Sequence, residues 1–533
     1  MTPIRSLLVS ALICGGVAIS SSSAHAAGCS DSWTKPASGD WGVAANWTNG
    51  IPTGNDSVCI AVPGTYTVTL APWSIGTADP NSNGANVASI TVGAASGTGT
   101  QTLDVVGQGS TSNSNEQVST VSLNTMGSDT STITAHGVLV LDSTDGGSTL
   151  PGNPSGGFAE VGGGPFLNDG KIESEIQDAK NKLANYTDFE APLTNEAGAS
   201  VTDDSGLLEV SNVTNDAAFT IASRASMSVI PPVFASPASF TNNGPFVNDG
   251  TLTGSTGATW TQAGGSVKGH AVTLQGGAKL VDRAGAGQFL VNYAGATLTG
   301  AIPAGQTVTV VGEPSSYQGN NYNGTTLGLG GTTVVNDGTL VLDAQGSGNK
   351  SGGPAIVNDG GIRNNGTIEA AVTDSSWNVQ FQVGLENSHS GRLVVTGGVF
   401  ADSGGPVIND GTVTVGPAAA YVLSAASSFK NTSQGAIVLQ IAGATRLGQF
   451  QLTAPCCSGP GALSAGGSVL PVLVHGYQPK SNLEFQLFLL SGGKFSGTFK
   501  TVASKFTADY TKETASPAFV GAIYDKSGTK PRK

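Results

Sequence analysis

Acidic residues with a basic neighbour are the positions of this 533-residue sequence that could support catalysis. Enzymes that cut polysaccharides place clustered carboxylates for acid–base work or Ca²⁺ binding, with an arginine or lysine nearby. Three short groups fit that description: Asp203-Asp204, Asp282-Arg283, and Glu386-x-x-His389-x-x-Arg392. An active site would require several of these side chains to converge on one face of the fold.

A second set of carboxylates belongs to a phrase that occurs five times. Two apolar residues run into Asn-Asp-Gly at 166–170, 246–250, 334–338, 356–360 and 407–411. The aspartates are Asp169, Asp249, Asp337, Asp359 and Asp410. Turn chemistry explains them, because Asn and Asp bond their own backbone and tolerate the left-handed conformation, which glycine also supplies. A stacked Ca²⁺ row is the alternative, but the calcium-roll repeat is absent from the sequence. We therefore expect a strand–turn–strand phrase and no metal.

Other catalytic motifs are missing from the sequence. The five histidines do not pair at the spacing of metal ligands, and no nucleophile elbow, phosphate-binding loop or dinucleotide fingerprint occurs. An enzyme hypothesis therefore rests on analogy with other folds alone. We expect no catalytic residue, no cofactor and no enzymatic activity.

The spacing of the asparagines predicts how these residues are positioned. Asn336 to Asn358, Asn387 to Asn409, and Asn409 to Asn431 are each 22 residues apart, and Asn248 lies 88 residues, four such units, before Asn336. Glycine corners with Val, Ile, Leu and Thr between them are typical of a solenoid. A leucine-rich repeat has a similar length, but its leucine frame is missing. We expect an all-β fold, a right-handed parallel β-helix of coils of about 22 residues.

Within that fold, the asparagine of each phrase is expected to form a hydrogen-bonded ladder between coils. The predicted ladder consists of Asn168, Asn248, Asn336, Asn358 and Asn409. This role is structural.

Composition agrees with a solenoid and excludes some partners. The chain has 77 glycines, 38% hydrophobic residues and only 11% charged residues. A solenoid lengthens without a thicker core, so 533 residues need not divide into globular domains. The formal net charge of −13 argues against nucleic acid and anionic membrane surfaces as partners.

The N-terminus predicts export. Residues 1–26 have a basic start at Arg5, an apolar stretch and an Ala-x-Ala cleavage motif, the features of a signal peptide. A lipoprotein is the alternative because Cys29 follows closely, but no Leu-rich lipobox precedes it. No later stretch reaches the roughly 20 apolar residues of a membrane span. We expect a secreted, extracellular or cell-surface protein.

Four cysteines remain beyond the signal, and four allow three pairings. Cys29 and Cys59 bracket the opening segment, and we expect them to pair in an oxidising compartment. Cys456 and Cys457 are adjacent, and they form a vicinal disulfide, stay reduced or cross-link. We expect a structural rather than a redox role, because no Cys-x-x-Cys or cationic neighbour is present.

The opening segment, 27–70, is rich in tryptophan. Trp33, Trp41 and Trp47 fall within 15 residues and precede Gly50, Pro52, Asp56, Val58 and Ile60. This W…W…NW…G…P…D…V…I pattern resembles the N-terminal segment of autotransporter-like, adhesin-type bacterial passenger proteins, which continue into β-helical repeats. We expect these aromatic residues to cap the open end of the solenoid. Stacking on sugar rings is the alternative.

The rest of the chain divides into 71–460, the predicted β-helix repeats, and 461–533, a predicted C-terminal β cap. The segment Gly476-Tyr-Gln-Pro479 with Phe485-Gln-Leu-Phe-Leu-Leu490 resembles the closing part of the same passengers. Members of that family continue into a translocator barrel. The sequence carries no such segment after this closing part, so the resemblance implies the passenger architecture and not self-transport.

Two stretches are expected to depart from regular coils. Residues 172–185 are charged and are either a helical excursion or a polar coil, and residues 313–332 look like a surface loop. At about 4.8 Å per strand layer, the repeats predict roughly 17 or 18 coils and a rod on the order of 80 Å long.

Three functional classes follow from this organisation. The first is a structural or adhesin-like rod that contacts extracellular matrix, polysaccharide or a cell-surface ligand. The second is a polysaccharide lyase or glycoside hydrolase on a β-helix. The third is a non-catalytic carbohydrate binder that uses Trp260, Trp377 or the N-terminal tryptophans. The scarcity of ionisable clusters favours the first class.

Overall fold

The computed structural model describes most of the chain after the predicted signal. The described residues are 28–72, 84–108, 120–144, 157–176, 186–231, 237–312, 316–317, 320–321, 324–344, 353–372, 378–424, 427–453, 460–512 and 518–526. The predicted signal peptide, Cys456, Cys457 and Trp377 lie outside them. Apart from one 3₁₀ turn, η1 (Ala44–Asn46), the secondary structure of the described residues is β-strand.

Sheet 1 is the longest of the three parallel sheets of the rod, with 25 strands. Its strands are β1 (Asp31–Ser32), β3 (Ser57–Ile60), β6 (Ser89–Val92), β9 (Ser131–Ile133), β12 (Phe166–Asn168), β15 (Leu193–Asn195), β18 (Asn212–Asn215), β21 (Ser239–Asn242), β24 (Thr259–Gln262), β27 (Ala278–Asp282), β29 (Ala296–Ile302), β33 (Thr325–Asn336), β35 (Ala355–Asn364), β37 (Asn378–Phe381), β38 (Gly384–Asn387), β40 (Gly398–Asp402), β41 (Pro406–Asn409), β43 (Ala419–Leu423), β44 (Ser428–Asn431), β46 (Gln449–Thr453), β47 (Ala462–Ala465), β49 (Glu484–Ser491), β50 (Lys494–Gly497), β52 (Phe506–Asp509) and β53 (Phe519–Tyr524).

Sheet 2 has nine strands and lies in the N-terminal half of the chain. Its strands are β2 (Gly39–Asp40), β4 (Tyr66–Leu70), β7 (Gln101–Gln108), β10 (Gly137–Thr144), β13 (Lys171–Ile176), β16 (Ser200–Asp203), β19 (Ala218–Ile221), β22 (Pro245–Asn248) and β25 (Ser266–Gly269).

Sheet 3 stacks 17 strands along the whole rod. Its strands are β5 (Gly84–Val87), β8 (Thr120–Thr125), β11 (Phe158–Gly163), β14 (Tyr186–Phe189), β17 (Gly206–Val210), β20 (Ala225–Val229), β23 (Thr251–Gly254), β26 (Val272–Leu274), β28 (Gly287–Val291), β30 (Gln306–Gly312), β34 (Thr339–Ala344), β36 (Thr367–Val372), β39 (Arg392–Val395), β42 (Thr412–Val415), β45 (Ala436–Ile441), β48 (Ser468–Leu473) and β51 (Thr501–Val502). A separate hairpin pairs β31 (Ser316–Tyr317) with β32 (Asn320–Asn321).

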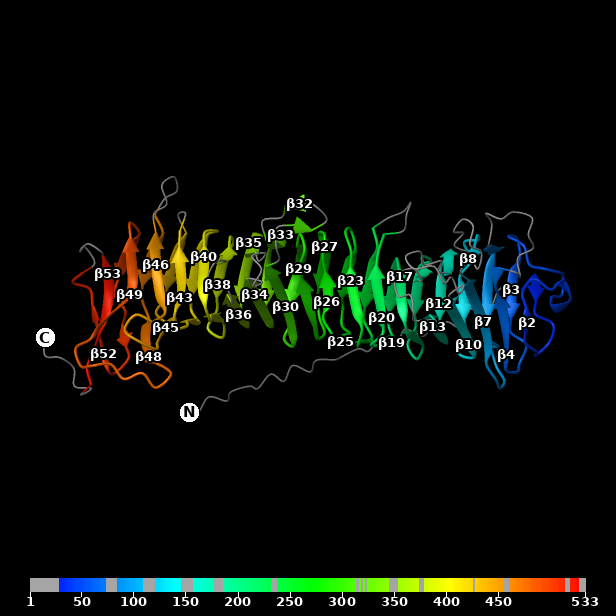
Figure 1. Ribbon diagram of the computed structural model, residues 1–533, viewed down its shortest axis with the longest axis horizontal. Helices are drawn as coiled ribbons and strands as arrows, with labels where there is room; N and C mark the ends of the chain where they lie inside the picture. Colours follow the sequence, from blue (N-terminus) through cyan, green and yellow to red (C-terminus); the bar gives the residue numbers. More distant parts are fainter. Residues whose placement is uncertain are drawn as a thin grey trace, which may run out of the picture.

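The chain visits the sheets in turn, so each strand pairs in parallel with the strand one coil later. In sheet 3, for example, β36 pairs with β39 and β39 pairs with β42. Figure 1 shows the result, a long rod in which the colours follow the sequence from one end to the other. The prediction of a parallel β-helix is confirmed.

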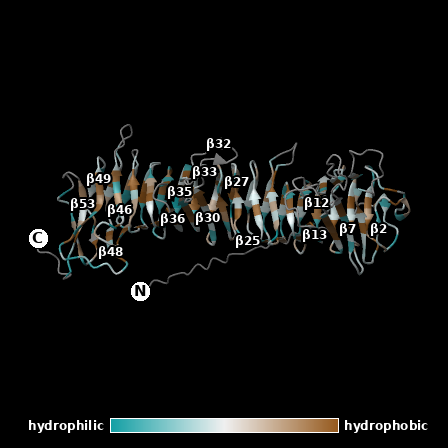
Figure 2. Ribbon diagram, viewed as in Figure 1, coloured by the Kyte–Doolittle hydropathy of each residue, from teal (hydrophilic) through white to brown (hydrophobic). Residues whose placement is uncertain are grey.

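Alternation along each strand places the core inside the coil. In β42 the burial alternates, with Val413 and Val415 buried and the threonines between them partly exposed. Brown and white or teal segments alternate along many strands in Figure 2, as this pattern requires. The inward residues of neighbouring coils stack into columns, such as Phe400, Tyr421, Phe450 and Phe488. The columns join into one continuous apolar core.

The coil cross-section changes after β25, where sheet 2 ends. Strands β33 and β35 run across two sides of the coil, and later coils divide this path between pairs such as β37 and β38.

Two predicted departures from regular coils can be compared with the structure. The prediction of a surface loop at 313–332 is wrong for residues 325–332, which lie in β33 with Leu327 and Leu329 buried. Residues 171–176 form strand β13, so the helical alternative does not apply there.

The N-terminal end is closed by the opening segment. Trp33, Trp41 and Trp47 are all buried, and the ring of Trp47 packs edge-on against both others at centroid distances of 5.0 and 4.8 Å. The Trp47 indole donates a hydrogen bond to the Trp41 carbonyl at 2.7 Å. A disulfide joins Cys29 to Cys59 on β3. This segment covers the core of the first coils.

The C-terminal end is closed by a change of strand direction. Strand β53 pairs antiparallel with both β49 and β52, unlike the parallel pairs along the rod. Its Phe519 and Tyr524 are buried, and Lys512 forms an ion pair with Glu484 of β49. The antiparallel strands end the succession of parallel coils.

The glycine of Asn-Asp-Gly has a different role from the expected one. Among the five copies, only Asp359 (φ 59°) and Gly360 (φ 154°) have positive φ. At Gly411, a Cβ atom would instead lie less than 3.0 Å from the carbonyl oxygens of Ser388 and Gly391 in the preceding turn. The close approach of successive corners excludes a side chain there.

Replacing this glycine tests the contact. Gly411→Ala should lower the free energy of unfolding by about 1–3 kcal/mol, because the corner must shift away from its neighbour. Gly264→Ala is the matched control, since no atom lies within 4 Å of a Cβ at that position. Urea denaturation of both variants measures the difference, and equal effects would contradict the explanation.

Candidate functional site

A row of buried amide side chains connects five coils at the corner between sheets 1 and 2. Each amide nitrogen donates to the side-chain oxygen of the next coil, at 2.8, 2.8, 2.9 and 3.3 Å. The members are Asn168, Asn195, Asn215, Asn242 and Gln262, and all are fully buried. A second N–H of Asn195 reaches the backbone oxygen of Ala218 at 3.1 Å. The row satisfies the polar groups of a corner from which water is excluded.

A second row lies farther along the rod at a different corner, where the chain enters sheet 3. It consists of Asn336, Asn364, Asn387, Asn409 and Asn431, joined by four hydrogen bonds of 2.7 Å. The row begins at the end of β33, after the cross-section has changed. In each part of the rod, the row lies at the corner where the Asn-containing turns are stacked.

The predicted ladder is correct for some residues and wrong for others. Asn168 belongs to the first row, and Asn336 and Asn409 belong to the second. Asn248 lies on β22 between Ile221 and Gly269, so it has no amide neighbour in register. Asn358 lies within β35, six residues before the true row member Asn364. The local phrase is the same, but its position on the coil differs.

The adjacent acid and base pairs do not form catalytic groups. Asp203 and Asp282 end their strands with fully buried side chains, whereas Asp204 and Arg283 follow them and are exposed. Neighbouring residues in a strand point to opposite faces, so the members of each pair cannot act on one substrate.

Glu386, His389 and Arg392 are all exposed around one turn. Glu386 forms an ion pair with Arg363 of the preceding coil at 3.0 Å, and both side chains are about half exposed. An exposed pair of this kind contributes little to stability. The three side chains lie on the outer surface of the rod at one corner.

The repeated aspartates are also separated by the fold. Asp169 follows the first Asn row, whereas Asp337 and Asp410 follow the second. Asp337 accepts a hydrogen bond from Asn365 at 2.9 Å, and Asp410 accepts one from Thr432. Asp249 is exposed at the bend after β22 and Asp359 is exposed within β35, and both lie outside the two rows. Among the described residues, no group of three or more His, Cys, Asp or Glu side chains is placed to hold a metal ion.

Several carboxyl groups inside the rod titrate abnormally. Burial raises the pKa of Asp203 to about 8 and the pKa values of Asp282 and Asp402 to about 7. Asp402 accepts a hydrogen bond from the Tyr421 hydroxyl at 2.8 Å, which opposes the rise in its pKa. These groups are enclosed by the core, so they affect stability rather than a substrate.

Carboxyl groups form a row on the outer face of sheet 3. Glu160, Asp188 and Glu209 are directly in register on three successive coils. Partial burial, followed by the neighbouring Glu190, Glu209 and Glu160, raises the pKa of Asp188 to about 8. The row therefore places three carboxyl groups side by side, of which Asp188 keeps its proton near neutral pH.

The tryptophans proposed for sugar stacking face the interior. Trp260 is 2% exposed, stacks on Phe240 and donates to Gln262 at 3.2 Å. The three N-terminal tryptophans are at most 4% exposed. None of these four offers a ring face to a ligand.

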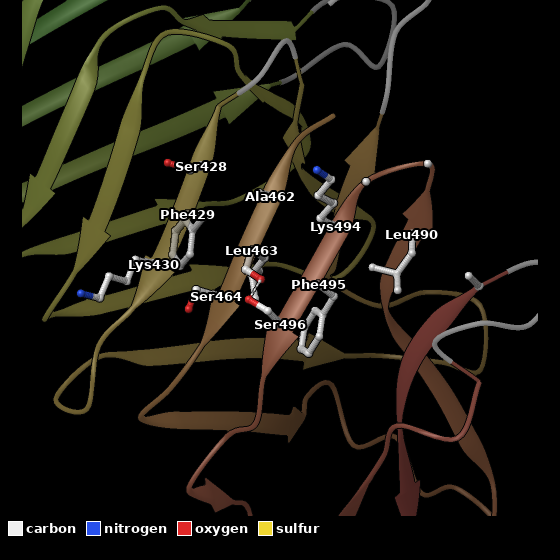
Figure 3. A pocket seen from close by; sticks show the side chains of 13 residues that line it. Ser428, Phe429, Lys430, Ala462, Leu463, Ser464, Leu490, Lys494, Phe495 and Ser496 are labelled. Atoms are coloured by element: carbon white, nitrogen blue, oxygen red, sulfur yellow. Dashed lines mark hydrogen bonds between the residues drawn. The ribbon is translucent and has the colours of Figure 1, made fainter. Parts of the chain in front are cut away.

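A feature that the sequence interpretation missed lies near the C-terminal end. Residues of the neighbouring strands β44, β47 and β50, together with Leu490, Ala518 and the turn after β49, line a hollow with a volume of 730 Å³ (Figure 3). Lys430 and Lys494 stand on its wall. The rise in lysine content after residue 430 was the available signal, but the sequence does not show that β44, β47 and β50 are neighbours in one sheet.

No protein-family model matches the chain, and no curated protein matches it.

Within the described residues, no helix is long and apolar enough to cross a membrane.

Interrupting the second Asn row should destabilise the rod. Asn387→Ala removes the acceptor of Asn364 and the donor to Asn409, and each buried group left unpaired costs about 1–3 kcal/mol. Asn365→Ala removes a partly exposed amide one residue from the row and serves as the control. Urea denaturation and hydrogen exchange of β36–β42 measure the effect. Equal stability of the two variants would contradict a structural role for the row.

The buried carboxyl groups predict the pH dependence of stability. The folded chain keeps their protons up to about pH 7–8, whereas an unfolded aspartate releases its proton near 3.9. Stability should therefore be greatest below about pH 4 for this contribution and should fall as pH rises toward 8.

Urea midpoints across this range measure the slope. Asp402→Asn should flatten it, because the amide cannot ionise, whereas the exposed Asp249→Asn should leave it unchanged. A slope that is the same in wild type and Asp402→Asn would contradict the assignment.

Proposed function

We propose that the chain is a secreted or surface-displayed β-helical rod, an adhesin-like structural protein that mediates extracellular contacts. The resemblance of segment 27–70 to autotransporter-like passengers and the signal-like residues 1–26 support this proposal. The mature protein is held or released outside the cell, and it needs no cofactor.

The single observation that carries the proposal is the separation of the ionisable groups from one another. The acid–base candidates are buried in the core, divided between opposite faces, or, as with Glu386, exposed at a corner and paired with Arg363. What remains outside is a regular surface of Ser, Thr and Asn on rigid parallel strands. Such a surface is suited to repeated contacts with a matrix, a polysaccharide or a neighbouring cell.

A polysaccharide lyase or glycoside hydrolase is the second candidate. Such enzymes bring two carboxylates, or carboxylates and a cation, to one bond. The carboxylate row of Glu160, Asp188 and Glu209 is the observation that favours it. That row lacks a basic partner among the ion pairs of the described residues, so the structural function is preferred.

An adhesion assay distinguishes the two functions. Residues 27–533, purified and labelled, should bind to at least one immobilised polysaccharide or matrix protein without releasing reducing or unsaturated sugar ends. Heat-unfolded protein is the control for non-specific adsorption. Sugar release that is abolished by a Glu160→Gln, Asp188→Asn double substitution would contradict the structural function and support the enzyme.

A further inference from the structure

The outer face of sheet 3 carries an apolar row directly beside the carboxyl row. Phe158, Tyr186 and Leu207 are in register on β11, β14 and β17, and all three side chains are partly exposed. The ring centroids of Phe158 and Tyr186 lie 4.0 Å apart. Strand residues two apart point to the same side, so the apolar row and the carboxyl row of these three strands form one surface. We call this surface the acid–aromatic face.

The acidic groups of this face are close to one another and to the phenol between them. Burial raises the pKa of Tyr186, and Glu209, Asp188, Glu160 and Glu190 raise it further. The two ion pairs found among the described residues involve other side chains, so neither of them balances these carboxyl groups. A cation placed here would contact both carboxylates and aromatic rings, the two groups that bind an ammonium ion best.

The chain itself supplies cations at its other end. Residues 430–533 contain 11 lysines and arginines and four aspartates and glutamates, a net charge of +7. Because the whole chain carries −13, residues 1–429 carry −20. The acid–aromatic face lies in the acidic part. Surfaces of opposite charge on two copies attract each other over a long range.

Three exposed lysines lie in the last coil of the rod. Lys494 begins β50, and Lys500 and Lys505 lie before and after β51. In the described part of the chain, β50 and β51 each pair with the preceding coil and with no later one. These lysines therefore stand at the end of the stack, where a second rod can approach them.

One rod cannot bring its own last coil to its own acid–aromatic face. Twelve parallel steps separate β17 from β51 along sheet 3. At about 4.8 Å per step, the separation is roughly 60 Å. A contact between the two surfaces therefore requires two copies.

We propose that the acid–aromatic face docks the last coil of a second copy of this chain. The lysines of that coil bind the carboxylates through charge-assisted hydrogen bonds and lie against the rings of Phe158 and Tyr186. The chain already makes one contact of this kind, because Lys512 pairs with Glu484 and lies 5.2 Å from the centre of the Phe519 ring.

The two docking surfaces differ, so the contact is heterologous and leaves one free face and one free end on every pair. Repeating it joins rods into a ring or an open filament. This self-assembly goes beyond the proposed adhesive function and does not depend on it.

Sedimentation velocity of residues 27–533 at about 0.01 M and about 1 M salt tests the docking, because salt screens exposed charges. The wild type should associate at low salt and dissociate at high salt. The face variant, Glu160→Lys with Glu209→Lys, should raise the dissociation constant about tenfold or more. The end variant, in which Lys494, Lys500 and Lys505 are replaced by glutamate, should do the same. An equal mixture of the two variants should associate again, since each surface then finds a partner of opposite charge.

Asp169→Lys with Asp249→Lys is the matched control, because it changes the net charge as the face variant does, at exposed positions on other corners. It should change the dissociation constant less than twofold. Unchanged circular dichroism verifies that every variant folds.

Restored association in the mixture, with neither variant associating alone, supports the docking. A wild type that sediments as one copy at low salt, a mixture that stays dissociated, or equal weakening by the face variant and the control would overturn it. Binding of a glucosamine oligomer that the face variant abolishes, without self-association of the wild type, would also overturn it and assign the face to a cationic polysaccharide.

Discussion

A single coil of this chain cannot bury its own inward side chains, and the rest of the structure depends on that constraint. Each coil has an open face above and below, lined by apolar residues such as Val413 and Val415. Parallel backbone hydrogen bonds hold the next coil at strand spacing and cover that face. The stack needs closure only at its ends, where tryptophans lie at one end and an antiparallel strand at the other.

At the corners between sheets, polar backbone groups are buried and need hydrogen-bond partners. Close stacking leaves no room for water or for a Cβ atom at Gly411, so buried amide side chains supply the hydrogen bonds. The two Asn rows occupy different corners because sheet 2 ends at β25 and the path of the coil changes. The outer surface is then free of this constraint and can vary, from the carboxylates on β14 to the lysines on β44 and β50.

The fold was predictable because its repeat is visible in the sequence. Which asparagines stack on one another in successive coils was only partly predictable. Asn387, Asn409 and Asn431 keep the 22-residue spacing and lie in one row. Asn336 is instead bonded to Asn364, 28 residues away, because the intervening coil is longer. The Asn-Asp-Gly phrase at Asn358 matches the repeat in sequence but not in position. A local phrase specifies a turn, whereas the length of each coil decides which corner that turn occupies. The hollow was not predictable for the same reason, since Lys430, Ser464 and Ser496 are neighbours at unequal spacings.

Coils far apart in sequence are stacked at strand spacing, and pulsed electron resonance between two spin labels tests this arrangement directly. Arg363 and Ser496 occupy outward positions of one register line that takes five parallel steps through β35, β38, β41, β44, β47 and β50. Labels on Arg363→Cys and Ser496→Cys, with Cys456 and Cys457 replaced by serine, should give one narrow distance distribution near 24 Å, at about 4.8 Å per step. A broad distribution, or a distance well beyond about 35 Å, would contradict the stacked register.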